Sequence, residues 1–173
     1  MRARRIAVLA ALVLTGLLLQ VSILPLVAGG GFTPDLLIVL VVVLTLEQGP
    51  RTGLWIAAVS GLLADLTLTT VPLGSTMLVQ VALAYVIGLL RPYLSERADL
   101  TTAVLAGFTG VVAVLAHGAL AALLSAQHPP AGEIVAWSAL VVGAFAILLA
   151  PLVLIVVRRT LAGTEASASE VSA

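Results

Sequence analysis

Residues 34–93 consist of three apolar segments joined by two short turns. The other residues of this stretch are mostly Pro, Gly, Asp and Arg, and they stand at or near the ends of the segments. Apolar segments bounded in this way are typical of helices that cross a lipid bilayer and turn at its surface. The stretch therefore predicts an all-α integral membrane protein.

The composition of the whole chain agrees with lipid as its main solvent. Hydrophobic residues make up 61% of the 173 residues and charged residues only 9%, whereas a soluble domain carries about 25% charged residues. The chain has no Cys and only two His, His117 and His128. A disulfide framework and a thiolate or histidine metal cluster are therefore not expected. We predict neither a cofactor nor a metal.

Hydropathy and helix-end signals predict a bundle of six transmembrane helices. A signal peptide is disfavoured at the N-terminus, because the first apolar run exceeds the about 7–15 residues of a signal-peptide core and is followed by more apolar segments. A single transmembrane domain is expected over residues 1–159. The polar, small residues after it predict a disordered tail over residues 160–173. The predicted helices are residues 6–28, 33–48, 52–69, 75–90, 101–124 and 134–157.

The second predicted helix is short. We expect Thr33 as its N-cap, Pro34 at the first helical position and Asp35 in the first turn. Residues 36–46 are free of charge, and they span about 17 Å against a hydrocarbon core of about 30 Å. The helix must therefore include Asp35 near the membrane boundary or thin the membrane locally. Gly49 is expected to end it.

Two of the predicted helices carry faces of small residues. Such residues let helix backbones approach closely, so these faces are expected to pack against protein rather than lipid. Pro50 is expected to open the third helix, and the turn after that helix contains Pro72 and Gly74. The face of the third helix consists of Gly53, Ala57, Gly61 and Asp65, and that of the fifth helix of Gly107, Gly110, Ala113, His117 and Ala121.

The positive charges predict the orientation. With six helices, every Arg of the chain falls on one side of the membrane, and positive charge marks the cytoplasm. Both termini are therefore expected to be cytoplasmic. Trp55 and Tyr93 near the inner boundary and Trp137 near the outer one fit interfacial aromatic belts. The arginines are Arg2, Arg4, Arg5, Arg51, Arg91, Arg97, Arg158 and Arg159.

Polar residues are expected to form a layer in the outer half of the membrane. An ionisable group at such depth costs about 2.5–3.5 kcal/mol unless it finds a partner or water. Because no Arg lies on that side, His117 is the expected partner of Asp65. Three interpretations stay open: contacts that hold the third and fifth helices together, a partner-binding groove open to the outside, and a small-molecule pocket. The layer consists of Gln20, Asp65, Gln80 and His117, with Asp35 at its edge.

The sequence does not indicate an enzyme. Asp35 and Asp65 lack the Gly-x-Gly-Asp context of intramembrane aspartyl proteases, and no Ser stands in a Gly-x-Ser-x-Gly elbow. The chain has no Lys and hence no phosphate-binding Gly-rich loop with a following Lys. We predict a non-catalytic protein without a nucleic-acid partner.

Four short elements of the sequence carry a resemblance to a known family. In order and spacing they resemble the rod shape-determining protein MreD family of bacteria. With His117, they supply the candidate helix-packing or partner-binding residues: Pro34, Asp35, Gly49, Pro50, Arg51, Gly53, Gly61, Asp65, Pro72, Gly74 and His117. The elements are Pro34-Asp35-Leu36-Leu37, Gly49-Pro50-Arg51-Thr52-Gly53, Gly61-Leu62-Leu63-Ala64-Asp65 and Pro72-Leu73-Gly74.

The resemblance implies a non-catalytic scaffold subunit of the bacterial cell-elongation machinery in the cytoplasmic membrane. The implied partner is an MreC-like bitopic protein. Through it, the subunit would be linked to MreB-like filaments and to the RodA-like and penicillin-binding proteins that synthesise peptidoglycan along the side wall. Membrane lipids are its expected surroundings.

The predicted fold is also similar to the substrate-binding subunits of energy-coupling-factor transporters. This similarity implies an alternative function, the binding of a vitamin-type small molecule for uptake. Ala7 and Ala11 match the small-residue docking motif of such subunits, but this spacing arises readily by chance in an Ala-rich helix. An uptake subunit is expected to carry more polar residues in its outer cavity and loops. The scaffold is therefore the favoured interpretation.

Overall fold

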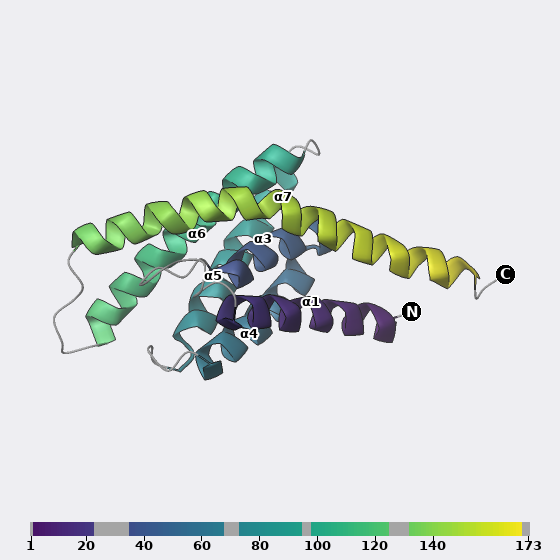
Figure 1. Ribbon diagram of the computed structural model, residues 1–173, viewed down its shortest axis with the longest axis horizontal. Helices are drawn as coiled ribbons and strands as arrows, with labels where there is room; N and C mark the ends of the chain where they lie inside the picture. The colour runs from purple at the N-terminus through teal and green to yellow at the C-terminus, as the bar shows by residue number, and fades with distance from the viewer. Residues whose placement is uncertain (1, 23–34, 68–72, 95–97, 125–131, 171–173) are drawn as a thin grey trace.

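The computed structural model describes residues 2–22, 35–67, 73–94, 98–124 and 132–170 (Figure 1). Within these ranges the chain forms six α-helices, one short 3₁₀ helix and no strand. The predicted all-α class is confirmed. The elements are α1 (Arg2–Ser22), α3 (Leu36–Gln48), α4 (Pro50–Thr67), α5 (Ser75–Leu90), η1 (Arg91–Tyr93), α6 (Ala98–Leu124) and α7 (Gly132–Glu170).

The turn between α3 and α4 forms as its residue types predict. Gly49 ends α3 with a φ of 92°, a backbone conformation that favours glycine. Its N–H donates to the carbonyl oxygen of Thr45 at 3.0 Å. Pro50 opens α4 at a position where a missing N–H leaves no helical hydrogen bond unmade.

The start of α3 differs from the prediction. Asp35, rather than Thr33, is the N-cap, and its Oδ1 accepts a hydrogen bond from the Ile38 N–H at 3.2 Å. Asp is at least as good an N-cap as Thr, because its carboxylate also interacts favourably with the positive end of the helix dipole. Thr33 and Pro34 lie outside the described residues.

Helix α7 is longer than predicted. It continues to Glu170, so the predicted helix end at residue 157 is too early. Residues 160–170, expected to belong to a disordered tail, are helical. Several of them are Ala, Leu and Glu, which have high helix propensity, so the helix continues beyond its apolar part.

Four stretches of the described chain are long and apolar enough to cross a membrane. They are Arg4–Ser22, Ser75–Tyr93, Leu100–Leu120 and Ile134–Ala162. Helix α3 is apolar but shorter. Helix α4 has 18 residues and includes Arg51 and Asp65.

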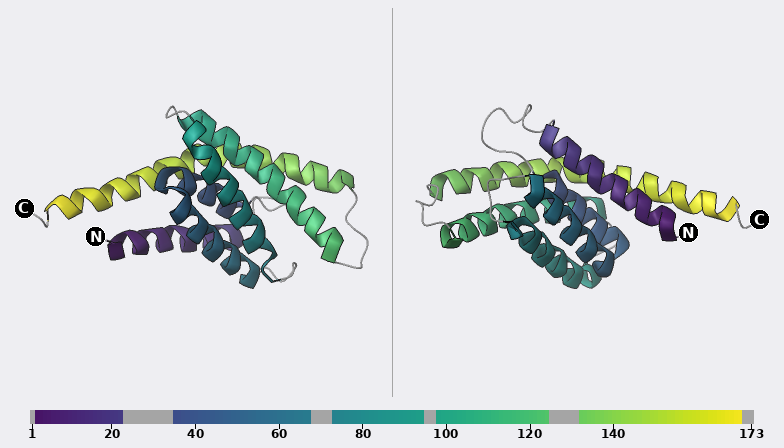
Figure 2. Two further views of the ribbon diagram at one scale, coloured as in Figure 1. Left: turned by 180° about the vertical axis from the view of Figure 1, so that it is seen from behind. Right: turned by 90° about the horizontal axis from the view of Figure 1, so that it is seen from below.

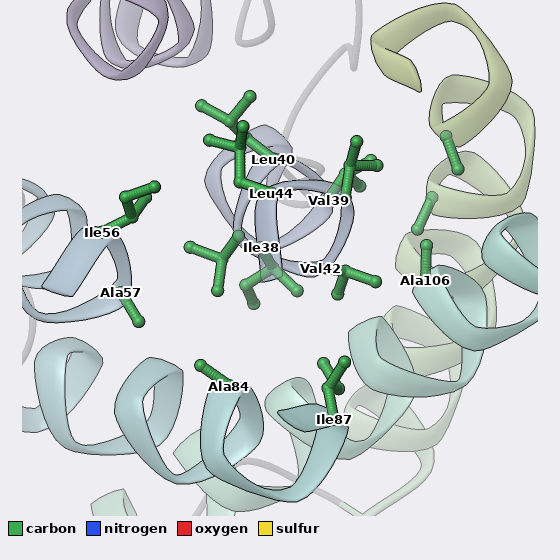
Figure 3. Packing of buried hydrophobic residues seen from close by; sticks show 14 of the residues in the cluster. Ile38, Val39, Leu40, Val42, Leu44, Ile56, Ala57, Ala84, Ile87 and Ala106 are labelled. Atoms are coloured by element: carbon green, nitrogen blue, oxygen red, sulfur yellow. The ribbon is translucent and has the colours of Figure 1, made fainter. Parts of the chain in front are cut away.

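Helix α3 lies at the centre of the bundle. It contacts α1, α4, α5, α6 and α7, and every residue from Leu36 to Thr45 is buried. Figure 3 shows its side chains pointing outward on all sides, toward Ile56 and Ala57 of α4, Ile87 of α5 and the neighbouring helices. A helix that is hydrophobic all round is stable when it is surrounded in this way. Because protein encloses α3, its short length does not require the membrane to thin.

The remaining helices surround α3 in two close pairs, α4 with α5 and α6 with α7, while α1 lies against α3 and also touches α4 and α7. The start of α1 and the end of α7 project at the same end of the molecule, as the views in Figures 1 and 2 agree. The first and last described helices therefore place both chain ends on one side of the bundle.

Candidate functional site

Arginine side chains gather around the C-terminal end of α3, which we call the arginine end. Helices α1 and α7 and the start of η1 each bring one Arg to this place. The carbonyl end of a helix carries a partial negative charge, so cations stabilise it. The contacts are Arg5 with the side-chain oxygen of Gln48, Arg91 Nε with the carbonyl of Leu46 at 2.8 Å, and Arg158 Nε with Glu47 Oε1 at 2.9 Å.

A polar cluster lies at the opposite end of α3. Oε1 of Gln20 accepts the N–H of Leu37 at 3.0 Å, one of the amides that a helix start leaves without an intrahelical partner. Oδ1 of Asp35 accepts the N–H of Ile38 at the same helix start. The cluster joins α1 and α3. On α6, Nδ1 of His117 is 2.8 Å from the carbonyl oxygen of Ala113.

Asp65 of α4 caps the N-terminal end of α5. The residue is 4% exposed, and its carboxylate accepts backbone N–H groups from Gly74 (2.9 Å), Thr76 (3.0 Å) and Met77 (3.1 Å). Gly74 is the N-cap of α5 with a φ of 93°, and glycine has no side-chain oxygen for capping. Asp65 supplies the missing acceptor and places negative charge at the positive end of the helix dipole.

These contacts differ from the expected pairing of Asp65 with His117. Asp65 is bonded to the start of α5, whereas the His117 ring contacts the carbonyl oxygen of Ala113 in its own helix. Helix α4 packs mainly on α5 and α3 rather than on α6. The prediction failed because it looked for the partner of Asp65 among side chains only, whereas the donors that Asp65 binds are backbone amides. A glycine N-cap nine residues after Asp65 was the signal that could have found them.

Gln80 of α5 lies between α4 and α5. It is 1% exposed, and its Oε1 accepts the hydroxyl of Ser60 at 2.8 Å. Among the described residues, Gln80 Nε2 and Ser75 Oγ are buried without a hydrogen-bond partner. The polar layer expected from the sequence is thus divided into one cluster at the start of α3 and two contacts between α4 and α5.

The contact between α4 and α5 depends on two glycines. A Cβ on Gly61 would lie 2.5 Å from Met77 Cα and 2.8 Å from its backbone nitrogen. Nearer the arginine end, a Cβ on Gly88 would lie 2.6 Å from Pro50 Cβ. Real Cβ atoms do not approach so closely, so only glycine permits these contacts. The small-residue face of α4 is buried throughout and consists of Gly53, Ala57, Gly61 and Asp65.

Most of the candidate residues lie where α3, α4 and α5 meet. Gly53 packs against the side chain of Thr45, with 2.7 Å between its would-be Cβ and the Cβ of Thr45. Arg51 is exposed at the start of α4. Pro34 and Pro72 lie outside the described residues. The residues at these junctions are Gly49, Pro50, Gly53, Gly61, Asp65 and Gly74, whereas Asp35 is the N-cap at the other end of α3 and His117 lies on α6.

The helices and contacts together define a multi-pass α-helical membrane protein in which polar side chains hydrogen-bond to the ends of neighbouring helices. Compared with protein families, residues 2–160 match the model of the rod shape-determining protein MreD. The chain belongs to the MreD family. No curated protein and no solved structure matches it.

Family membership confirms the resemblance and extends it from the short elements to nearly the whole chain. It implies a role in rod-shape determination within the cell-elongation machinery. MreD proteins are non-catalytic, so the prediction that the chain is not an enzyme is confirmed. The similarity to energy-coupling-factor subunits stays a prediction.

Proposed function

We propose that this protein is a scaffold subunit that binds an MreC-like bitopic protein and thereby supports peptidoglycan synthesis along the side wall. MreB-like filaments and the RodA-like and penicillin-binding synthases are its indirect partners. The observation that carries the proposal is the family match over residues 2–160.

The use of the polar side chains supports a scaffold over an uptake subunit. Both carboxylate oxygens of Asp65 are bonded to amides of α5, and Gln20 is bonded at the start of α3. An uptake subunit must keep such groups available for its ligand. In this bundle the polar side chains instead cap helix ends. Such capping holds the helices in place, so that the bundle presents a fixed outer surface to other proteins.

Purification of the tagged protein from a strain that also expresses the MreC-like protein tests this proposal. We expect the MreC-like protein to co-purify, and native mass spectrometry to show no stoichiometric small molecule. An unrelated polytopic protein with the same tag controls for non-specific capture. A vitamin bound at about one per chain would favour the uptake subunit, since a subunit of that kind must retain its ligand.

We also propose that both termini face the cytoplasm. The arginine end and the projecting ends of α1 and α7 support this orientation, since positive charge marks the cytoplasmic side. The chain lacks Cys, so single introduced thiols report topology cleanly. Cys at Ser95 is expected to react only from the cytoplasm and Cys at Gln127 only from outside. Labelling of both from one face would contradict this orientation.

A further inference from the structure

Helix α4 has a second face, two residues out of phase with its small-residue face and hence on the other side of the helix. Whereas the small-residue face is buried, Trp55 is 71% exposed and Val59 is 51% exposed. This second face therefore does not pack on α5. It consists of Arg51, Trp55, Val59 and Leu63.

The second face of α4 and helix α1 enclose a groove of about 950 Å³. The α1 side is lined by aliphatic side chains between Ile6 and Leu14. The α4 side is aliphatic except for Arg51, Thr52 and Trp55. These three residues come from the first two turns of α4, so they lie together where the groove reaches the arginine end.

Arg51 differs from the arginines that contact the end of α3. Within the part of the chain that the structure describes, its guanidinium has no ion-pair or hydrogen-bond partner. Arg5 and Arg91, in contrast, are bonded to α3. The groove therefore combines a long aliphatic lining with an uncompensated positive charge at one end.

We propose that this groove binds an anionic phospholipid, with the lipid phosphate at Arg51 and acyl chains along the aliphatic part. Guanidinium binds phosphate oxygens through charge-assisted hydrogen bonds, and the Thr52 hydroxyl is a second donor at the same end of the groove. Indole rings favour the level of the lipid headgroups, which suits Trp55. Basic pockets between transmembrane helices bind anionic headgroups elsewhere. This site is independent of the proposed scaffold function.

A second groove, between α1, α3 and α7, shows what Arg51 contributes. Its volume is about 340 Å³, and its lining contains no charged residue. Side chains such as Leu12, Leu40 and Val153 can accommodate an acyl chain there. That groove has no cation to select a headgroup, so charge selectivity is expected only at Arg51.

Quenching of Trp55 fluorescence by brominated phospholipids tests the proposal. The full chain, with Trp137→Phe so that Trp55 is the remaining Trp, is reconstituted in phosphatidylcholine vesicles. Brominated phosphatidylglycerol or brominated phosphatidylcholine is then added at equal mole fractions. We expect about fivefold tighter binding of the anionic lipid, the effect of roughly 1 kcal/mol per arginine near a membrane surface. Arg51→Gln is expected to abolish this preference.

Arg159→Gln is the matched control, because it removes the same charge from an exposed position of α7 that does not line the groove. It is expected to retain the preference. Helical content and thermal stability show whether both variants fold. Equal quenching by the two lipids, or an equal effect of the two Arg variants, would overturn the proposal. Quenching by neither lipid would also overturn it, since a protein segment would then fill the groove.

Discussion

The α4–α5 and α6–α7 pairs are both packed through glycine, but the atoms that face the glycines differ. At Gly61 the nearest atoms belong to the backbone of Met77. At Gly107 they belong mainly to the side chain of Ile147, with the carbonyl oxygen of Gly143 at 3.1 Å from a would-be Cβ. A side chain can change rotamer, whereas a backbone moves only with its helix. The α4–α5 contact therefore tolerates added volume less.

The two pairs also differ in how polar groups are used. Asp65 connects α4 to three backbone amides at the start of α5. In the described part of the α6–α7 pair, Thr109 and Ser138 bond carbonyls of their own helices, each at 2.6 Å. A stripe of small residues thus indicates a close neighbour, but not the interaction that holds the neighbour in place.

The largest effect is expected for Gly61→Leu. The new side chain would displace the backbone at Met77, and overpacking of this kind costs about 3 kcal/mol or more. Thermal unfolding in detergent and co-purification with the MreC-like protein measure the effect. Ala82→Leu adds the same side chain at an exposed position of α5 and is expected to be neutral. A Gly61→Leu protein as stable as the parent would show that α4 and α5 can separate at little cost.

Asp65→Ala is expected to be the next most harmful change. It leaves amides at the start of α5 without an acceptor, at a cost of about 2 kcal/mol. Asp65→Asn keeps one acceptor oxygen but turns an NH₂ group toward donors, so an intermediate loss of about 1 kcal/mol is expected. The midpoint of denaturant unfolding ranks the variants. Thr109→Val, which removes a bond within α6 only, is the control. If Thr109→Val lost as much stability as Asp65→Ala, the two helix pairs would not differ in how their polar groups stabilise them.

The fold could be predicted from the sequence wherever residue type determines backbone conformation. Gly49 and Pro50 form the expected turn, and α5 spans the predicted residues 75–90. The spacing of Gly61 and Asp65 predicted a buried face, and both are buried. The length of α7 was missed, because polar residues at a helix end do not distinguish a continuing helix from a disordered tail.

The candidate site could be predicted only in part. Asp65 was identified as a buried ionisable residue, but its partners are backbone amides of Gly74 and the first turn of α5, which a search among side chains does not find. Arg51 was one of eight arginines that the sequence predicts on the inner side of the membrane. Its lack of a partner among the described residues and the groove beside it depend on how α1 lies against α4, and that arrangement is set by the packing of both helices around α3.

Gly107→Ala tests whether the α6–α7 pair accommodates volume through its side chains. The new methyl group would meet Ile147, which is 43% exposed and can turn away. We expect a loss of about 1 kcal/mol, at the low end for overpacking. Thermal unfolding in detergent, in parallel with Gly61→Ala on the α4–α5 side, gives the direct comparison. The two pairs are equivalent if both alanine variants lose the same stability.

The smallest effect is expected for Gly110→Ala, in the same α6–α7 pair. A Cβ there would lie 3.5 Å from Ala146 Cβ and from Val142 Cγ1, which is ordinary van der Waals contact. Alanine has a helix propensity about 1 kcal/mol more favourable than glycine, so Gly110→Ala is expected to leave stability unchanged or raise it slightly. A higher unfolding midpoint would show that this glycine is not required for close approach, unlike Gly61. Clear destabilisation would mean that the helices of this pair lie closer together than these distances indicate, and the contrast with α4–α5 would disappear.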